Sequence, residues 1–167
     1  MTIGRISSCA AIVALASALA VAQTAAAGKP VRTLITPTPF VVSDVCAFDV
    51  GVVPNGKDQV LTTFDSGRTV VHTNSSPTLT NLVSGKSLVY RLRYIATADP
   101  AGIVGSLNGQ FNFLLFPGDV GPSGVVPDGA FLHIVGHLRY TLDPETFAVT
   151  SFSVRGTVTD ICADLAR

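Results

Sequence analysis

The amino-acid sequence predicts a single all-β domain, an antiparallel up-and-down barrel of about eight strands closed by one disulfide bond. Three observations support this prediction. Short runs with apolar residues at alternate positions fill most of the chain, Gly/Pro/Asn/Asp turn signals separate these runs, and no stretch of helical length has an apolar period of 3.6 residues. A rolled β-sandwich is the alternative, because alternation and turns alone do not distinguish the two architectures.

The N-terminal region has the features of a signal peptide. A start with one positive charge at Arg5 leads into an apolar and small-residue stretch over residues 6–22, and Ala25 and Ala27 fit the small-x-small rule for signal peptidase. We therefore expect residues 1–27 to be removed. A retained anchor is the alternative, although alanine is only weakly hydrophobic. No other segment reaches the ~20 apolar residues that span a bilayer, so we expect no membrane span after processing and a secreted or cell-wall-associated protein.

Two cysteines remain after this cleavage. Cys9 is lost with the leader, whereas Cys46 and Cys162 stay in the mature chain. Two cysteines in an exported protein usually pair, and two free buried thiols are the alternative. Both fall on the apolar faces of the first and last expected strands, so a bond between them would join the two ends of the sheet and close it.

The composition indicates one domain with no strong electrostatic partner. The mature chain has about 140 residues, a normal size for one core, with a Pro-rich arm at 28–40 and the barrel domain at 41–167. The formal net charge is +0 and only 13% of residues are charged, with no basic or acidic run. Nucleic acids and anionic membrane surfaces are therefore not expected partners. No motif indicates a cofactor.

Alternation defines the strands. In 103–116 it continues without a slip through Asn108-Gly109, a pair that usually marks a hairpin. A two-residue turn there would place Leu107 opposite Gln110, so we expect one long strand eased by its glycines. The residues 117–129 read as an irregular Gly/Pro loop at a rim. The outward faces are polar, which excludes a lipid-facing barrel. The expected strands are 44–53, 58–65, 69–74, 78–83, 87–97, 103–116, 130–142 and 147–162.

Aromatic residues on the inward face are the candidate ligand-binding residues. They are Tyr90, Tyr94, Phe111 and Phe113, and plain core packing is the alternative for all of them. Asp160 joins them because it falls on the apolar parity, two residues before Cys162, where a buried carboxylate would need a partner. The alternative is that the alternation of apolar residues ends near the C-terminus, so that Asp160 is not buried.

Arginines on the polar faces form a second candidate site. If their strands are adjacent, they would make a basic stripe for a carboxylate or a sulfated glycan. Cross-strand pairing with acids such as Asp49 and Asp65 is the alternative. The arginines concerned are Arg91, Arg93, Arg139 and Arg155.

Metal and catalytic signals are weak. His133 and His137 share a strand face but lie ~13 Å apart along it, too far to ligate one metal without help. His72 is a third histidine that nothing ties to them, so solvated surface histidines are expected and no metal. No serine lies in a Gly-x-Ser-x-Gly elbow. Catalytic residues therefore stay unassigned.

Several motifs together resemble a known group of proteins. They are Cys46-Ala-Phe-Asp-Val, Thr63-Phe-Asp-Ser-Gly-Arg68-Thr, Ser84-Gly-Lys-Ser, the long strand ending Leu-Leu-Phe116-Pro-Gly, and Gly156-Thr-Val-Thr-Asp160-Ile-Cys162. This pattern is similar to small secreted β-rich proteins of high-GC Gram-positive, actinobacterial type. The resemblance implies export and a paired cysteine near each end, and it implies no activity.

The sequence favours a non-enzymatic role. We expect a secreted β-barrel domain that binds a small apolar ligand, a glycan or a protein partner. One alternative is a cyclase or isomerase of barrel type that acts in an apolar cavity, because such enzymes carry little sequence signature. A structural or inhibitory cell-surface protein is the other.

Overall fold

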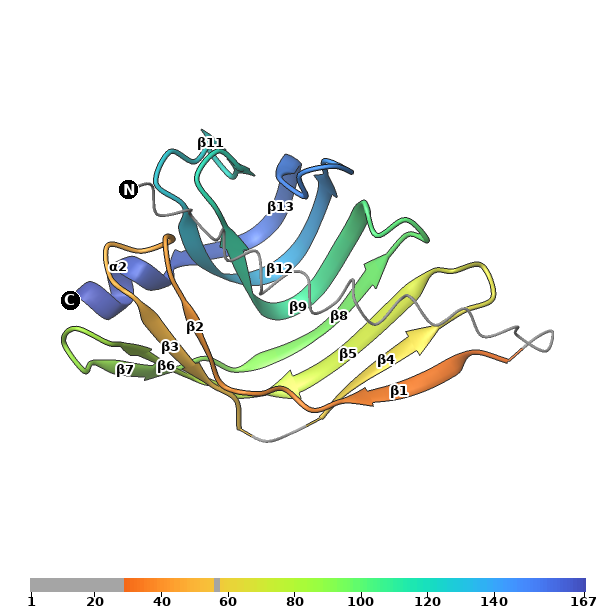
Figure 1. Ribbon diagram of the computed structural model, residues 1–167, viewed down its shortest axis with the longest axis horizontal. Coiled ribbons are helices and arrows are strands. Elements are labelled where there is room, and N and C mark those ends of the chain that lie inside the picture. The colour runs from red at the N-terminus through yellow and green to blue at the C-terminus, as the bar shows by residue number, and fades with distance from the viewer. Residues whose placement is uncertain (1–28, 56–57) are drawn as a thin grey trace, which may run out of the picture.

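The computed structural model describes residues 29–55 and 58–167, and it is almost entirely β-structure (Figure 1). One short helix, α2 (Ile161–Ala166), ends the chain. Within the described ranges, no helix has the length and apolar character needed to cross a membrane. The expected signal peptide lies outside these ranges. The predicted disulfide is confirmed: Cys46 and Cys162 are bonded, with their Cα atoms 5.4 Å apart.

Most of the strands lie in two antiparallel sheets. The large sheet has seven strands in the order β1-β4-β5-β8-β9-β12-β13, and the small sheet has four in the order β2-β3-β6-β7. A two-stranded hairpin, β10 (Val120–Gly121) with β11 (Gly124–Val125), stands apart. The large sheet contains β1 (Val31–Ile35), β4 (Gln59–Thr63), β5 (Thr69–Ser75), β8 (Leu92–Ala98), β9 (Val104–Leu115), β12 (Ala130–Leu142) and β13 (Val149–Asp160); the small sheet contains β2 (Phe40–Val42), β3 (Val50–Val53), β6 (Thr78–Asn81) and β7 (Ser87–Val89).

Four pairs of consecutive strands, which we call stretches, connect the two sheets. In each pair, one strand follows the other along the chain, and the two strands lie in different sheets. The pairs are β1/β2, β3/β4, β5/β6 and β7/β8. The bend between β5/β6 and β7/β8 is held by the Tyr90 N–H, which donates to the Pro77 carbonyl at 3.3 Å. The single strand predicted at 87–97 is therefore wrong: it is two strands in different sheets. Alternation did not reveal this, because a bend at Tyr90-Arg91 keeps the parity unchanged.

The predicted single closed barrel is not confirmed, although the all-β class is. β1 and β13 are opposite edges of the large sheet, and β2 and β7 are opposite edges of the small one. When each of the four stretches is counted as one strand and the β10–β11 hairpin is set aside, strands that are neighbours along the chain are also neighbours in the sheets, as an up-and-down order requires. The first four stretches bend away into the small sheet instead of continuing a single wall, and this leaves the sheets open.

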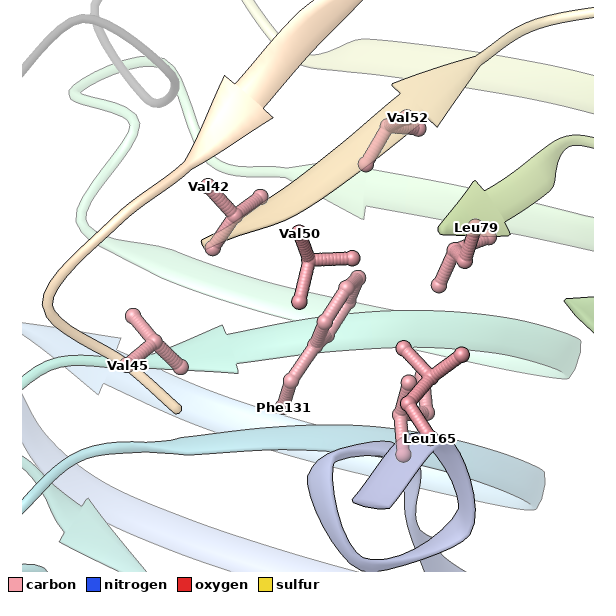
Figure 2. Close-up of a cluster of buried hydrophobic side chains, with 8 residues drawn as sticks. Val42, Val45, Val50, Val52, Leu79, Phe131 and Leu165 are labelled. Carbon is pink, nitrogen blue, oxygen red and sulfur yellow. The ribbon is translucent and has the colours of Figure 1, made fainter. Parts of the chain in front are cut away.

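Two hydrophobic clusters lie on opposite faces of the large sheet. The inter-sheet core joins the small sheet, the start of β12 and α2, and Figure 2 shows Phe131 pointing at Val50 beside Leu165 of the helix. The sheet-face core lies on the other face of β9 and β12 and contains Phe111 and Ile134, both fully buried. We call this second face the apolar face. The rest of the inter-sheet core is Val42, Val45, Val52, Leu79 and Ile161.

The disulfide joins a loop to a helix and not two strands. The strand expected at 44–53 begins only at Val50, so Cys46 lies in the bend between β2 and β3. β13 ends at Asp160, whose carboxylate accepts a hydrogen bond from the Ala163 N–H at 3.1 Å and caps α2. Cys162 is therefore helical. The helix escaped prediction because six residues are too short to show a period.

Two segments expected to be irregular contain β-structure. The Pro-rich arm includes β1, which pairs with β4 over five residues. The 117–129 loop contains the β10–β11 hairpin, anchored by the buried Asp119 carboxylate. Its two oxygens accept hydrogen bonds from the Phe116 N–H and the Val149 N–H, each at 2.7 Å.

The long strand through Asn108-Gly109 is confirmed, since β9 runs unbroken from Val104 to Leu115. Gly109, Gly136 and Gly156 lie in register across β9, β12 and β13, with φ of 128°, 149° and 136°. A Cβ at Gly136 would collide with the Arg155 carbonyl. Glycine is therefore required along this row, where the strands bend together.

Candidate functional site

A groove of about 560 Å³ lies where the β4–β5 and β8–β9 turns meet at one end of the large sheet. We call it the rim groove. The turns pack closely: a Cβ at Gly67, whose φ is +78°, would lie 2.9 Å from Pro100 Cβ. Its lining residues are Ser66, Arg68, Thr97, Ala98, Asp99, Pro100, Val104, Gly105, Ser106, His137 and Arg139.

The β4–β5 turn positions Arg68. The Phe64 N–H donates to the Arg68 carbonyl at 3.0 Å, and the Gly67 N–H donates to the Phe64 carbonyl at 2.8 Å. The Arg68 guanidinium then lies over the Phe64 ring, with Cζ 4.6 Å from the ring centroid. This cation–π contact restrains an otherwise mobile side chain while leaving its N–H donors available.

The β8–β9 turn positions Asp99. Its Oδ1 accepts hydrogen bonds from the Ile103 N–H at 2.8 Å and the Val104 N–H at 3.2 Å. Oδ1 of the carboxylate is thus held by backbone amides, and no hydrogen bond joins its Oδ2 to a described residue. Asp99 can therefore accept a hydrogen bond from a ligand hydroxyl.

Three adjacent strands supply the rest of the groove. Thr97 of β8 pairs with Ser106 of β9, which pairs with Arg139 of β12. The Thr97 and Ser106 hydroxyls are 2.7 Å apart. His137 lies two residues before Arg139 and so shares its strand face, and both side chains are exposed.

The arginines predicted to form a stripe are partly adjacent. Arg155 of β13 lies opposite His137, next to Arg139, whereas Arg93 lies on β8 beyond β9 and Arg91 lies in the break before β8. Among the described residues, the structure contains one ion pair, between Arg167 and Asp164. The alternative in which Asp49 neutralises one of these arginines is thus not observed. Arg139 has no carboxylate partner among the described residues.

The structure brings three of the five predicted ligand residues together. Tyr94, Phe111 and Phe113 lie on the apolar face, where the Tyr94 and Phe111 ring centroids are 5.9 Å apart. The Phe113 ring contacts Tyr140 at 5.3 Å and Phe152 at 5.6 Å. Phe152 is two strands away from Phe113, so the sheet must curl to bring these rings together. Asp160 lies apart, at the cap of α2.

Tyr90 belongs to a different site. Its hydroxyl donates to Asp164 Oδ2 at 2.9 Å, and its ring centroid is 4.8 Å from that of His133. Burial and the Asp164 hydrogen bond raise the pKa of Tyr90 to about 12. Lys86 Nζ donates to the Asp164 carbonyl at 2.8 Å. These contacts hold α2 against β7 and line a smaller groove of about 390 Å³.

No metal site is evident in residues 29–55 and 58–167, where no three His, Cys, Asp or Glu side chains gather. His133 Nδ1 lies 2.8 Å from Asn112 Oδ1, and burial lowers the pKa of its imidazole. His137 lines the rim groove, and His72 is exposed on β5.

Sequence reasoning missed most of the rim groove. Arg68 and Asp99 come from turns that carry no known motif, and only the fold brings them next to β12. The signal that could have found them is the pair of tight turns, Asp65-Ser-Gly-Arg68 and Asp99-Pro-Ala-Gly102, at the same end of neighbouring strands.

Comparison with known proteins finds no matching family model, no similar curated protein and no similar solved structure. The resemblance to secreted actinobacterial proteins therefore stays a prediction.

Proposed function

We propose that this protein is an exported binding domain that recognises an oxyanion-bearing saccharide, carboxylated or sulfated, in the rim groove. The observation that carries the proposal is the convergence of Arg68 and Arg139 over one groove in which Asp99 is already held by backbone amides. An arginine without a carboxylate partner is ready to form a charge-assisted pair with a ligand oxyanion.

The remainder of the groove suits a saccharide. Ala98, Pro100 and Val104 add apolar atoms to its lining, which the C–H face of a sugar ring can contact. Ser66 and His137 add hydrogen-bonding groups at its edge, and the free oxygen of Asp99 accepts from a ring hydroxyl. Apolar lining with a few placed polar groups is the usual composition of small-ligand sites.

Export is part of the proposal. A disulfide that spans most of the chain is compatible with an oxidising compartment outside the cell. The leader-like residues 1–27 agree with this location. An enzyme of cyclase or isomerase type and a structural or inhibitory surface protein stay as alternatives from the sequence.

Calorimetric titration tests the proposal. The probes are oligogalacturonate, which carries carboxylates, chondroitin sulfate oligosaccharide, which carries both groups, and neutral maltohexaose. We expect the anionic probes to bind and maltohexaose not to bind, with affinity falling as salt rises because the contact is exposed.

The matched variants are Arg139→Ala and Arg91→Ala. Arg139 lines the groove, whereas Arg91 is also exposed but lies outside it. Loss of one charge-assisted contact predicts about tenfold weaker binding for Arg139→Ala and no change for Arg91→Ala. Equal binding of maltohexaose, or equal losses in the two variants, would contradict the proposal.

A further inference from the structure

The apolar face of the large sheet carries hydroxyl groups that sequence analysis did not connect. Thr73 of β5 lies opposite Tyr94 of β8 in the strand register, and Tyr140 of β12 faces the same side. Thr73 is only 4% exposed, and its Oγ1 is buried with no hydrogen-bond partner among the described residues. A buried hydroxyl without a partner costs about 1–3 kcal/mol, so its place in an apolar surface needs an explanation.

Gly105 allows Tyr140 to reach toward β8. Gly105 lies between Tyr140 and Ala98 in the register of β12, β9 and β8. A Cβ at this glycine would collide with the Tyr140 ring and hydroxyl. The phenol therefore lies over Gly105 of β9. Burial, and to a smaller extent the charges of Asp99 and Tyr94, raise the pKa of Tyr140.

Both phenols are hydrogen-bond donors at neutral pH. Burial raises the pKa of Tyr94, and the nearby Thr73 hydroxyl lowers it only in part. No hydrogen bond of acceptable geometry joins Thr73 to Tyr94, although they are close. The donors are set among apolar side chains: Ala96, Leu107, Phe111, Phe113 and Leu138.

The face is reachable from solvent. Tyr94 and Tyr140 are half-buried, and the large sheet ends in the unpaired edges β1 and β13. A ligand can therefore contact the exposed part of both rings. An apolar molecule gains from contact with the rings, and an oxygen acceptor on it would satisfy the hydroxyls.

We infer that the apolar face binds an uncharged apolar molecule that carries a carbonyl oxygen, and that the Tyr94 and Tyr140 hydroxyls, with Thr73 beside them, donate to that oxygen. This site is separate from the rim groove in its ligand: it takes a neutral acceptor, whereas the groove takes an anion. The inference does not depend on the proposed function.

The test compares 2-octanone with 1-octene, which differ in the carbonyl group. The chain has no tryptophan and three tyrosines, so tyrosine fluorescence and NMR report directly on this region. We expect 2-octanone to bind about tenfold more tightly than 1-octene. Equal affinity for the two probes, or binding of neither, would overturn the inference.

Three variants keep the ring or the side-chain shape while removing one hydroxyl. Tyr94→Phe, Tyr140→Phe and Thr73→Val are each expected to weaken 2-octanone binding about three- to tenfold and to leave 1-octene binding unchanged. Tyr90→Phe is the control, because Tyr90 donates to Asp164 at another site. Equal losses in Tyr90→Phe and Tyr140→Phe would overturn the assignment, and so would loss of 2-octanone binding in Arg139→Ala.

Discussion

The inter-sheet core and the apolar face are built from similar apolar side chains but differ in what holds and covers them. Around Phe131 the small sheet, the large sheet and α2 pack on one another, and the Cys46–Cys162 bond fixes them covalently (Figure 2). On the apolar face, Tyr140 and Phe152 are half-buried, and the rings are covered mainly by one another and by the curl of the sheet. Each cluster contains eight buried residues, so the difference lies in the covalent bond of the inter-sheet core and in the partly exposed rings of the apolar face.

Removal of the disulfide should give the largest change in the free energy of unfolding. Its loop spans a sequence separation of 116 residues, so its loss should lower the free energy of unfolding by about 4–5 kcal/mol. Urea unfolding of the wild type with and without reductant measures the effect, and the Cys46→Ser/Cys162→Ser double variant should match the reduced protein. A loss below about 1 kcal/mol would show that the inter-sheet core holds without its covalent bond.

Paired truncations compare the two cores directly. Phe131→Ala removes a ring that is 3% exposed from the inter-sheet core and should cost about 3–4 kcal/mol. Phe152→Ala removes a half-buried ring from the apolar face and should cost about half as much. The wild-type ring buries less apolar area there, and the surrounding side chains can move to fill the cavity. Urea unfolding of both proteins gives the ratio. Equal costs would mean that the apolar face is packed as tightly as the inter-sheet core.

The glycine row tests how the sheet bends. Gly136→Ala adds a methyl group that meets the Arg155 carbonyl at a φ of 149°, and we expect a loss of about 2–3 kcal/mol. Gly118→Ala is the matched control, since Gly118 also has a positive φ of 98° but open space around it. Its cost should stay near 1 kcal/mol. Thermal unfolding of the two variants separates the collision from the backbone strain that they share.

Sequence reasoning succeeded where one physical cause acts alone. β9 and β12 alternate strictly, so their extent was predictable, including the passage of β9 through Asn108-Gly109. The strand predicted at 147–162 is two residues too long at each end, since β13 covers Val149–Asp160. The disulfide followed from Cys46 and Cys162 being the two cysteines outside the expected signal peptide.

The failures have a common origin in tertiary context. The bend at Tyr90 leaves the alternation intact, so nothing local marks the change of sheet. The short helix α2 depends on its Asp160 cap and on packing against the small sheet. The rim groove combines two turns with three strands, and only the register of β8, β9 and β12 places Arg139 opposite Ser106.

The smallest predicted effect concerns the contact that fastens α2 to the small sheet. The pKa of Tyr90 is raised to about 12 from 10.0, first by burial and then by its hydrogen bond to Asp164, so folding favours the protonated phenol. Its contribution is complete below pH 10.0 and is lost as pH rises toward 12. Tyr90 is half-buried, so solvent screening limits the contribution to about 1 kcal/mol.

Tyr90→Phe should therefore be less stable than the wild type by about 1 kcal/mol at pH 8, and this gap should close between pH 10.0 and about 12. Urea unfolding of both proteins at matched pH measures it, and other titrating groups cancel in the difference. A gap that persists at high pH would assign the stabilisation to ring packing on His133 and not to the Asp164 hydrogen bond. The helix would then be fastened mainly by the disulfide, and the contrast between the two ends would depend on that bond more heavily.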